Sequence, residues 1–176
     1  MFPVAGTPPY ESAVRALAGL LGKQRAEFVF VGTVARAAHL GSQPIAAGSV
    51  DALALIGQQQ KNQLAMMAAN SGFAVDRDEL EATEELDLVP MKFDGVRLHV
   101  LVASNALYGR MVNDGTTAAF GDLTIRVPRA EDLALLLQMS SDADALMELA
   151  ASPGFDRAGF NRKLISIGLR ELVISE

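Results

Sequence analysis

The side chain best suited to chemistry in this sequence is the carboxylate of Asp51, which stands at the start of the apolar run 52–56. A carboxylate at the mouth of a strand can hold a divalent cation beside a phosphate, because Mg²⁺ binds to one or two carboxylates together with phosphate oxygens and water. Asp51 is therefore a candidate catalytic residue and the candidate metal ligand. The alternative is that its side chain only caps a turn before the strand, and both interpretations stay open.

A second candidate feature is the pair Gly32 and Thr33, which separates the β-rich run 28–31 from a segment with helical spacing, 34–40. A strand that stops at glycine and continues as a helix directs the free N–H groups of the helix beyond the strand end, where phosphates are often held. We therefore interpret Gly32 and Thr33 as candidate nucleotide-binding residues, with Arg36 on the helix as a polar neighbour. A glycine after a strand also marks an ordinary tight turn.

A third candidate is His99, which lies in a segment that alternates so that Arg97, His99 and Leu101 share one face. Neutral histidine can accept a proton near pH 7, but it does not replace an anionic ligand of the hard cation Mg²⁺. The alternative is a strand histidine held by a neighbouring hydrogen bond. His39, on the 34–40 helix, is expected to be a packed or half-exposed residue.

These residues need a scaffold of mixed strands and helices, and the pattern predicts an α+β fold. The expected strands are 28–31, 52–56, 88–93 and 96–103, with a turn at Asp94-Gly95, and a further hairpin at 116–120 and 123–127. The expected helices are 11–21, 34–40, 58–71, 105–112, and then 129–139, 142–150, 156–165 and 169–173. We expect Lys61 on a solvated helix face. The acidic block 76–85 is expected as an exposed loop or short helix.

Composition excludes several classes of function. The chain has 176 residues and no cysteine, which excludes disulfides and thiolate zinc sites. Its formal net charge of −6 argues against broad nucleic-acid binding, which would normally show a basic stripe. No apolar run approaches the roughly 20 residues needed to span a bilayer, and the first residues lack the pattern of a signal peptide. We therefore expect a cytoplasmic protein without membrane contact.

Together these motifs resemble the active-site core of the nucleotidyltransferase superfamily with the DNA polymerase β type of fold. The likeness is greatest to a small bacterial group that includes toxin-type nucleotidyltransferases of toxin–antitoxin systems. Members carry a glycine pair or Gly-Ser opening a helix, then Asp-x-Asp on the next strand, and a third acid on a later strand. Here Gly32-Thr33 stands at the glycine motif, Ser49-Val50-Asp51 at the Asp-x-Asp motif, and His99 at the third acid.

In this register Ser49 and His99 replace two of the three expected acids, and only Asp51 is kept. A second register makes Asp51 the first acid and Leu53 the second, which still leaves one carboxylate missing. Gln43 stands where relatives often carry arginine, and Leu136 or Leu137 where a lysine is common. The phrase Val-Pro-x-x-Glu-Asp-Leu at 127–133 resembles the one that introduces the C-terminal helices of the family.

The resemblance implies a nucleotidyltransferase-like domain at residues 1–127 and a C-terminal helical segment, 128–176, packed on it. It implies that Asp51, His99 and Ser49 occupy the catalytic positions, and that Gly32, Thr33, Arg36 and Gln43 contact a nucleotide. Binding of Mg²⁺ with a nucleoside triphosphate is expected to be weak or absent, because the acids have changed. We therefore expect a catalytically impaired protein, a pseudoenzyme, with a nucleotide-binding or interaction role.

Two alternatives to this expectation remain. One is an active, metal-dependent nucleotidyltransferase that moves NMP to an unknown acceptor and recruits another acid, for example from 76–85. The other is a structural role in a homo-oligomer or with a protein partner, through the apolar C-terminal helices.

Overall fold

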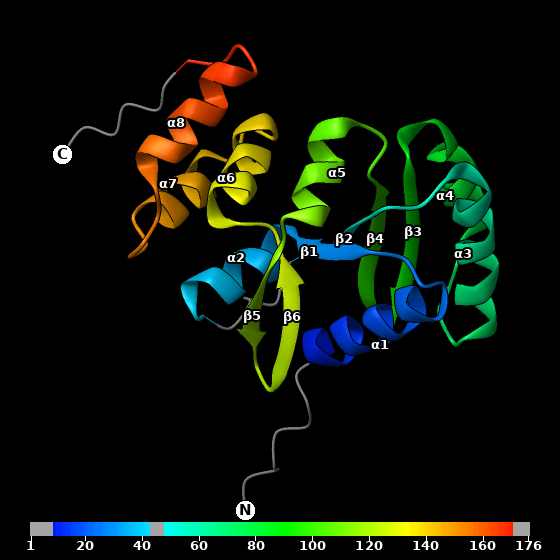
Figure 1. The fold of residues 1–176 in the computed structure, drawn as a ribbon. Helices are drawn as coiled ribbons and strands as arrows, with labels where there is room; N and C mark the ends of the chain where they lie inside the picture. Colours follow the sequence, from blue (N-terminus) through cyan, green and yellow to red (C-terminus); the bar gives the residue numbers. More distant parts are fainter. Residues whose placement is uncertain (1–8, 43–47, 171–176) are drawn as a thin grey trace, which may run out of the picture.

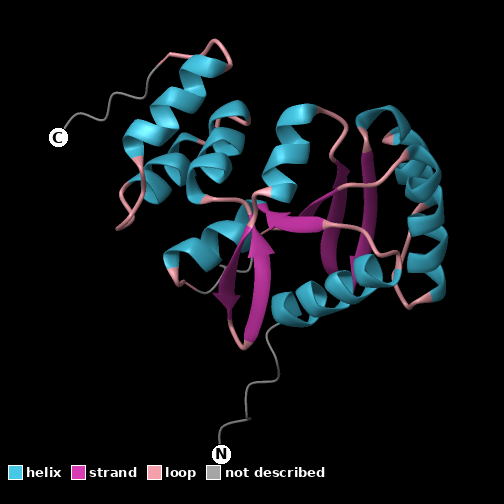
Figure 2. Cartoon of the chain, viewed as in Figure 1, coloured by secondary structure: helices cyan, strands magenta, loops and turns pink. Residues whose placement is uncertain are grey.

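The computed structural model describes residues 9–42 and 48–170, and its strands lie between helices on several sides (Figures 1 and 2). Gln43 falls outside the described residues. The predicted α+β class is confirmed. Among the described residues, no helix has the length and apolar character needed to cross a bilayer.

Four strands form the main sheet in the order β1-β2-β4-β3. They are β1 (Phe28–Val31), β2 (Val50–Ala54), β4 (Val96–Val102) and β3 (Leu88–Phe93). β2 and β4 are parallel, whereas β1 is antiparallel to β2 and β3 is antiparallel to β4. β2 begins and ends two residues earlier than predicted, so Asp51 lies within the strand and not before it.

The two hairpins form where their turn residues predict them. Asp94 and Gly95 join β3 to β4 with φ values of +48° and +78°, and a two-residue turn of this kind needs a positive φ at both positions. β5 (Thr116–Phe120) and β6 (Leu123–Val127) pair separately as a second antiparallel ribbon, and β6 packs against β1.

Alternation along the strands gives the main sheet one fully apolar face. In β2, Val50, Ala52 and Ala54 are completely buried, whereas Asp51 on the other face is only half-buried. Helix α1 (Pro9–Lys23) packs on β2 and β4, and α3 (Gln58–Asn70) packs on α1 and β3, so that the apolar face forms the core. The face that carries Asp51 is therefore the one on which polar chemistry is possible.

Lys61 contradicts the expectation of a solvated face. Its side chain on α3 is 2% exposed, and its ammonium donates to the backbone carbonyl of Glu84 over 2.6 Å. Glu84 begins the short 3₁₀ helix η1 (Glu84–Leu86), which follows α4 (Arg77–Ala82) in the acidic block. The burial of Lys61 could not be predicted from the sequence, because a single lysine in a run of polar residues gives no apolar periodicity.

The other helices surround the face that carries Asp51. Helix α2 (Gly32–Leu40) follows β1 directly, two residues earlier than predicted, and α5 (Ala106–Asn113) packs on β1 and β2. Between Pro128 and residue 170 the regular elements are all helices: α6 (Ala130–Met139), α7 (Ala143–Ala150) and α8 (Arg157–Ser166).

These three C-terminal helices lie together at one end of the molecule, with α6 and α7 against α2 (Figure 1). The carboxylates of Asp142 and Asp156 accept backbone N–H bonds at the starts of α7 and α8. The helix predicted at 169–173 is wrong for residues 169 and 170, which have no regular structure, and its remainder lies outside the described residues.

Candidate functional site

Asp51 and His99 form the centre of the candidate site. They are register partners on the parallel strands β2 and β4, so their side chains leave the same face of the sheet. Nδ1 of His99 lies 2.8 Å from Oδ1 of Asp51, a hydrogen bond that becomes an ion pair when the imidazole is protonated. The two side chains are 27% and 23% exposed, so solvent or a ligand can reach both.

The other carboxylate oxygen of Asp51 lies against the start of α2. Gly32 opens this helix with a φ of +62°, and a Cβ added there would come within 3.0 Å of Oδ2 of Asp51. The N-terminus of a helix stabilises a nearby negative charge, because its first N–H groups have no partner within the helix. Oδ2 of Asp51 is therefore close to the start of α2.

A cleft of about 350 Å³ opens beside Asp51 and Gly32. Its walls come from the end of β1, from β4, from α5 and from α6. The lining residues are Val31, Gly32, Asp51, Leu101, Tyr108, Leu133, Leu136, Leu137, Met139 and Ser140. In the part of the chain that the structure describes, no lysine or arginine belongs to this lining. Leu136 and Leu137 fill the wall where the sequence resemblance leads one to expect a lysine.

The geometry is that of a known fold. No protein-family model matches the sequence, and no curated protein sequence matches it. Among solved structures, the lincosamide antibiotic adenylyltransferase LnuA, solved with lincomycin bound, superposes with a TM-score of 0.58 at 12% identity, over 80% of this chain and 96% of that one. ANT(2″)-Ia in complex with adenylyl-2″-tobramycin gives 0.55 at 12% identity, over 86% of this chain and 97% of that one. This chain has the nucleotidyltransferase fold.

The remaining residues predicted for the site are only partly brought together. Ser49 directly precedes β2 and, by strand alternation, belongs to the side of Asp51. Thr33 lies in the first turn of α2, where its Oγ1 is 3.3 Å from the position of a Cβ on Gly48. Arg36 does not line the cleft: its Nε lies 3.8 Å from a carboxylate oxygen of Glu148 on α7. The predicted nucleotide contact of Arg36 is therefore not supported by its position.

His39 is a packed residue, as expected. Its Nε2 forms a 2.8 Å hydrogen bond with the carbonyl oxygen of Pro128. The bond ties the last turn of α2 to the point where the chain enters the C-terminal helices of the nucleotidyltransferase fold.

The donor set around Asp51 does not fit a catalytic magnesium pair. Mg²⁺ needs near-octahedral oxygen ligation, and two-metal transfer needs ligands on both sides of the reacting phosphate. Ser49 adds no charge and His99 adds a nitrogen that already contacts Oδ1 of Asp51. Within residues 9–42 and 48–170, no three His, Asp or Glu side chains are grouped so that they could hold a metal ion. The acidic block does not contribute either, because none of its residues lines the cleft.

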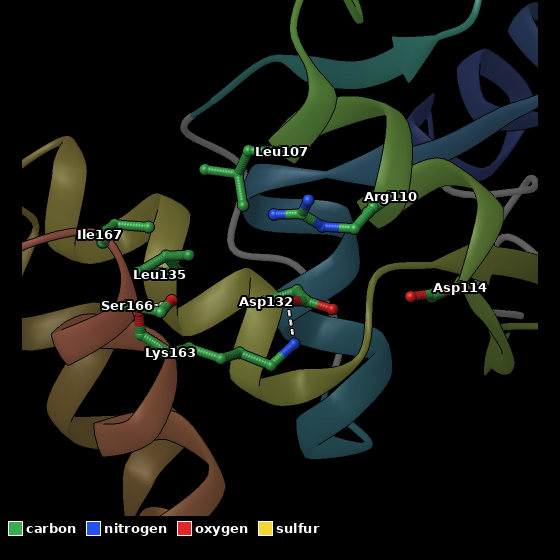
Figure 3. A pocket seen from close by; sticks show the side chains of 8 residues that line it. All are labelled: Leu107, Arg110, Asp114, Asp132, Leu135, Lys163, Ser166 and Ile167. Atoms are coloured by element: carbon green, nitrogen blue, oxygen red, sulfur yellow. Dashed lines mark hydrogen bonds and ion pairs between the residues drawn. The ribbon is translucent and has the colours of Figure 1, made fainter.

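A second pocket, of about 100 Å³, lies on the other side of α6 (Figure 3). Arg110 of α5 points into it. Lys163 of α8 forms an ion pair with Asp132 of α6, and the side chain of Asp132 is 8% exposed. Leu107, Asp114, Leu135, Ser166 and Ile167 complete the lining. Sequence reasoning missed this pocket, because its polar residues come from three helices that are distant in the chain and carry no common motif.

Sequence reasoning also missed the cleft residues Leu101 and Tyr108. The only available signal was the alternation of β4, which puts Leu101 on the face of His99. Tyr108 gave no such signal, since a tyrosine on a short amphipathic helix is most simply a core residue.

Proposed function

We propose that this chain is a nucleotidyltransferase-fold protein that binds a nucleotide in the cleft beside Asp51 and does not transfer it. The observation that carries the proposal is the 2.8 Å contact between Asp51 and His99. The carboxylate that would bind metal in an active enzyme is held by a histidine at one oxygen and lies against the start of α2 at the other.

The loss of transfer follows from the charges at the site. A nucleotidyl transfer spreads negative charge over the reacting phosphate, and metal ions held by several carboxylates normally offset it. Among the residues that the structure describes, Asp51 is the single carboxylate in the lining of the cleft. Neither Ser49 nor His99 supplies the anionic oxygen ligands that would hold Mg²⁺ tightly.

The retained binding follows from the shape and lining of the cleft. Its volume of about 350 Å³ lies within the roughly 300–1,000 Å³ usual for small-molecule pockets, which are mostly apolar with a few polar groups. Tyr108 and the leucines of α6 offer apolar surface for a base or a sugar ring, and Asp51 can accept a hydrogen bond from a hydroxyl. The two adenylyltransferases that share the fold are described with small molecules bound.

The proposal is tested first by assaying transfer and binding side by side. With ATP, GTP, CTP or UTP and Mg²⁺ or Mn²⁺, we expect the purified protein to transfer no radiolabelled nucleotide to itself, to RNA or to a partner protein. Calorimetry should still detect binding of at least one nucleotide, with nearly the same affinity in EDTA as in Mg²⁺. Transfer by the unmodified protein that is abolished in Asp51→Ala would overturn the proposal and establish an active enzyme.

A gain-of-function variant provides the second test. Ser49→Asp combined with His99→Asp places like charges beside Asp51, which destabilises the metal-free fold. We expect this variant to melt at a lower temperature than the unmodified protein in EDTA and to recover with Mg²⁺. The matched variant Ser49→Asn with His99→Asn should show no such recovery, because it adds amides in place of charges.

A protein contact through the C-terminal helices is the second candidate function. Of the large apolar side chains that are exposed in the described residues, most belong to this segment: Met139, Met147, Ile165, Ile167 and Leu169. Contiguous exposed apolar surface often marks a binding site for a protein. Light scattering should show a dimer or larger assembly if a second copy is the partner. The resemblance to toxin-type nucleotidyltransferases predicts instead a complex with a different protein.

A further inference from the structure

The face of the sheet that carries Asp51 and His99 also carries two cationic side chains. In the antiparallel register of β3 and β4, Lys92 is opposite Arg97 and Pro90 is opposite His99. Opposed residues leave the same face of a sheet, and so do residues two apart on one strand. Lys92 and Arg97 therefore share the face of His99, and both are exposed.

This pair of cations is not explained by the packing of the sheet. Like charges directly opposite each other in an antiparallel pair destabilise it. In residues 9–42 and 48–170, neither side chain has an ion-pair or hydrogen-bond partner. Asp76 and Glu79 line a pocket with Lys92 at the sheet edge but form no ion pair with it. The chain has more acids than bases, with a net charge of −6, and yet within the described residues neither cation forms an ion pair.

The location of Arg97 relates the pair to the candidate site. The parallel register pairs Val50 with Leu98 and Asp51 with His99. Extending this register by one residue puts Ser49 opposite Arg97. Arg97 is thus next to Ser49, the position at which the sequence resemblance leads one to expect a metal-binding acid. The pair of Asp51 and His99 lies farther along the same face.

We propose that Lys92 and Arg97 bind the phosphate groups of the ligand whose other end lies in the cleft, and that they supply the positive charge that Mg²⁺ would supply in an active site. The inference rests on the proposed nucleotide binding and names the residues that hold the anionic end. Arginine suits this role, because its planar guanidinium can donate two parallel hydrogen bonds to phosphate oxygens.

The spacing along β4 matches a ligand with one apolar and one anionic end. Leu101, His99 and Arg97 follow one another on one face at every second residue, so Leu101 in the cleft wall and Arg97 are about 13 Å apart. The base or sugar would contact Leu101 and Tyr108, and the phosphates would extend over His99 towards Arg97.

The experiment compares three probes in EDTA by calorimetry: ATP, adenosine and inorganic tripolyphosphate. We expect Arg97→Gln and Lys92→Gln each to lower the affinity for ATP and for tripolyphosphate about tenfold, as for the loss of one charge-assisted hydrogen bond. The affinity for adenosine should not change. Lys23→Gln, which removes an exposed cation at the end of α1, should change none of the three affinities. Equal ATP affinity in the Arg97 and Lys92 variants and the unmodified protein would overturn the inference.

The unmodified protein gives a second measurement that does not depend on any variant. Added NaCl should weaken the binding of ATP and of tripolyphosphate, because salt screens exposed charges. The binding of adenosine should not depend on salt. ATP binding that is insensitive to salt would contradict the inference and leave the proposed function intact. No binding of ATP or adenosine by the unmodified protein would refute nucleotide binding itself. The glutamine variants should melt no lower than the unmodified protein, since each removes one charge of a repelling pair.

Discussion

The two sides of helix α6 differ in chemistry. On one side, Leu133, Leu136 and Leu137 form an apolar wall facing Asp51. On the other, Asp132 is ion-paired with Lys163 in a pocket that Arg110 also lines. The cations of this region are therefore separated by the helix from the carboxylate that would need them in a transferase.

The difference teaches that packing and the charges of this region depend on different positions of α6. The fold needs a helix whose apolar stripe covers the end of the sheet, and α6 provides it. Leucines occupy the cleft side of the same helix, where the sequence resemblance leads one to expect a lysine. This chain thus keeps the nucleotidyltransferase fold with an apolar wall beside Asp51.

The largest effect is expected on the cleft side, from Leu133→Ala. Leu133 is completely buried although it also lines the cleft wall, so its truncation should cost about 2–5 kcal/mol of unfolding free energy. Urea denaturation measures the loss. Leu136→Ala, a partly buried neighbour on the same wall, is the matched control and should cost clearly less. Equal losses would contradict the difference in packing between Leu133 and Leu136.

The next effect belongs to the polar side, from Lys163→Met. The change leaves the buried carboxylate of Asp132 without its cation, which should cost about 1–3 kcal/mol, at the lower end because Lys163 is itself partly exposed. Adding Asp132→Asn should recover part of the loss, since the remaining group is neutral. Arg162→Met, on the exposed side of α8, should have almost no effect in the same denaturation series. If the double variant is as unstable as Lys163→Met, the ion pair is not the cause.

Gly32→Ala should cost about 1–2 kcal/mol, because a residue with a Cβ is disfavoured in the left-handed conformation found there. The added methyl group would also press on Oδ2 of Asp51. We expect the His99 imidazole resonances in NMR spectra to shift as the carboxylate moves. Gly41→Ala, at another positive φ but with open space around it, should destabilise the protein without shifting those resonances.

The smallest effect should follow from moving a positive charge to the cleft side. Leu136 is partly exposed on that side. The variant Leu136→Lys should therefore strengthen ATP binding in EDTA by about 0.5–1 kcal/mol, or two- to fivefold. Leu136→Met, which keeps the apolar wall, should leave the affinity unchanged. A loss of affinity in the lysine variant would indicate that the ligand needs apolar contact at this position.

Much of the fold was accessible from the sequence because the signals are local. Phe28–Val31 and the Asp94-Gly95 turn were predicted at their observed positions, since a short β-rich run and a positive-φ dipeptide depend on few neighbours. The resemblance also assigned Asp51 and His99 to one catalytic site, and the register of β2 and β4 brings the two side chains together. The division of the chain at Pro128 into two units stays a prediction.

The rest of the site depends on contacts between distant segments. Arg36 has the right spacing for the cleft, but the ion pair with Glu148 is visible only once α7 is packed on α2. The opposition of Lys92 and Arg97 requires the register of a hairpin. The burial of Lys61 requires the position of η1, more than twenty residues away.

That buried lysine has a consequence for how the molecule opens. In the described part of the chain, the one acceptor of the Lys61 ammonium is the backbone carbonyl of Glu84. The group cannot lose this acceptor while it stays buried, because an uncompensated buried charge is very costly. The acidic segment is highly charged and mostly exposed, which suggests independent fraying. Its attachment through Lys61 instead couples it to α3, so the two segments should exchange their amide hydrogens as one cooperative unit.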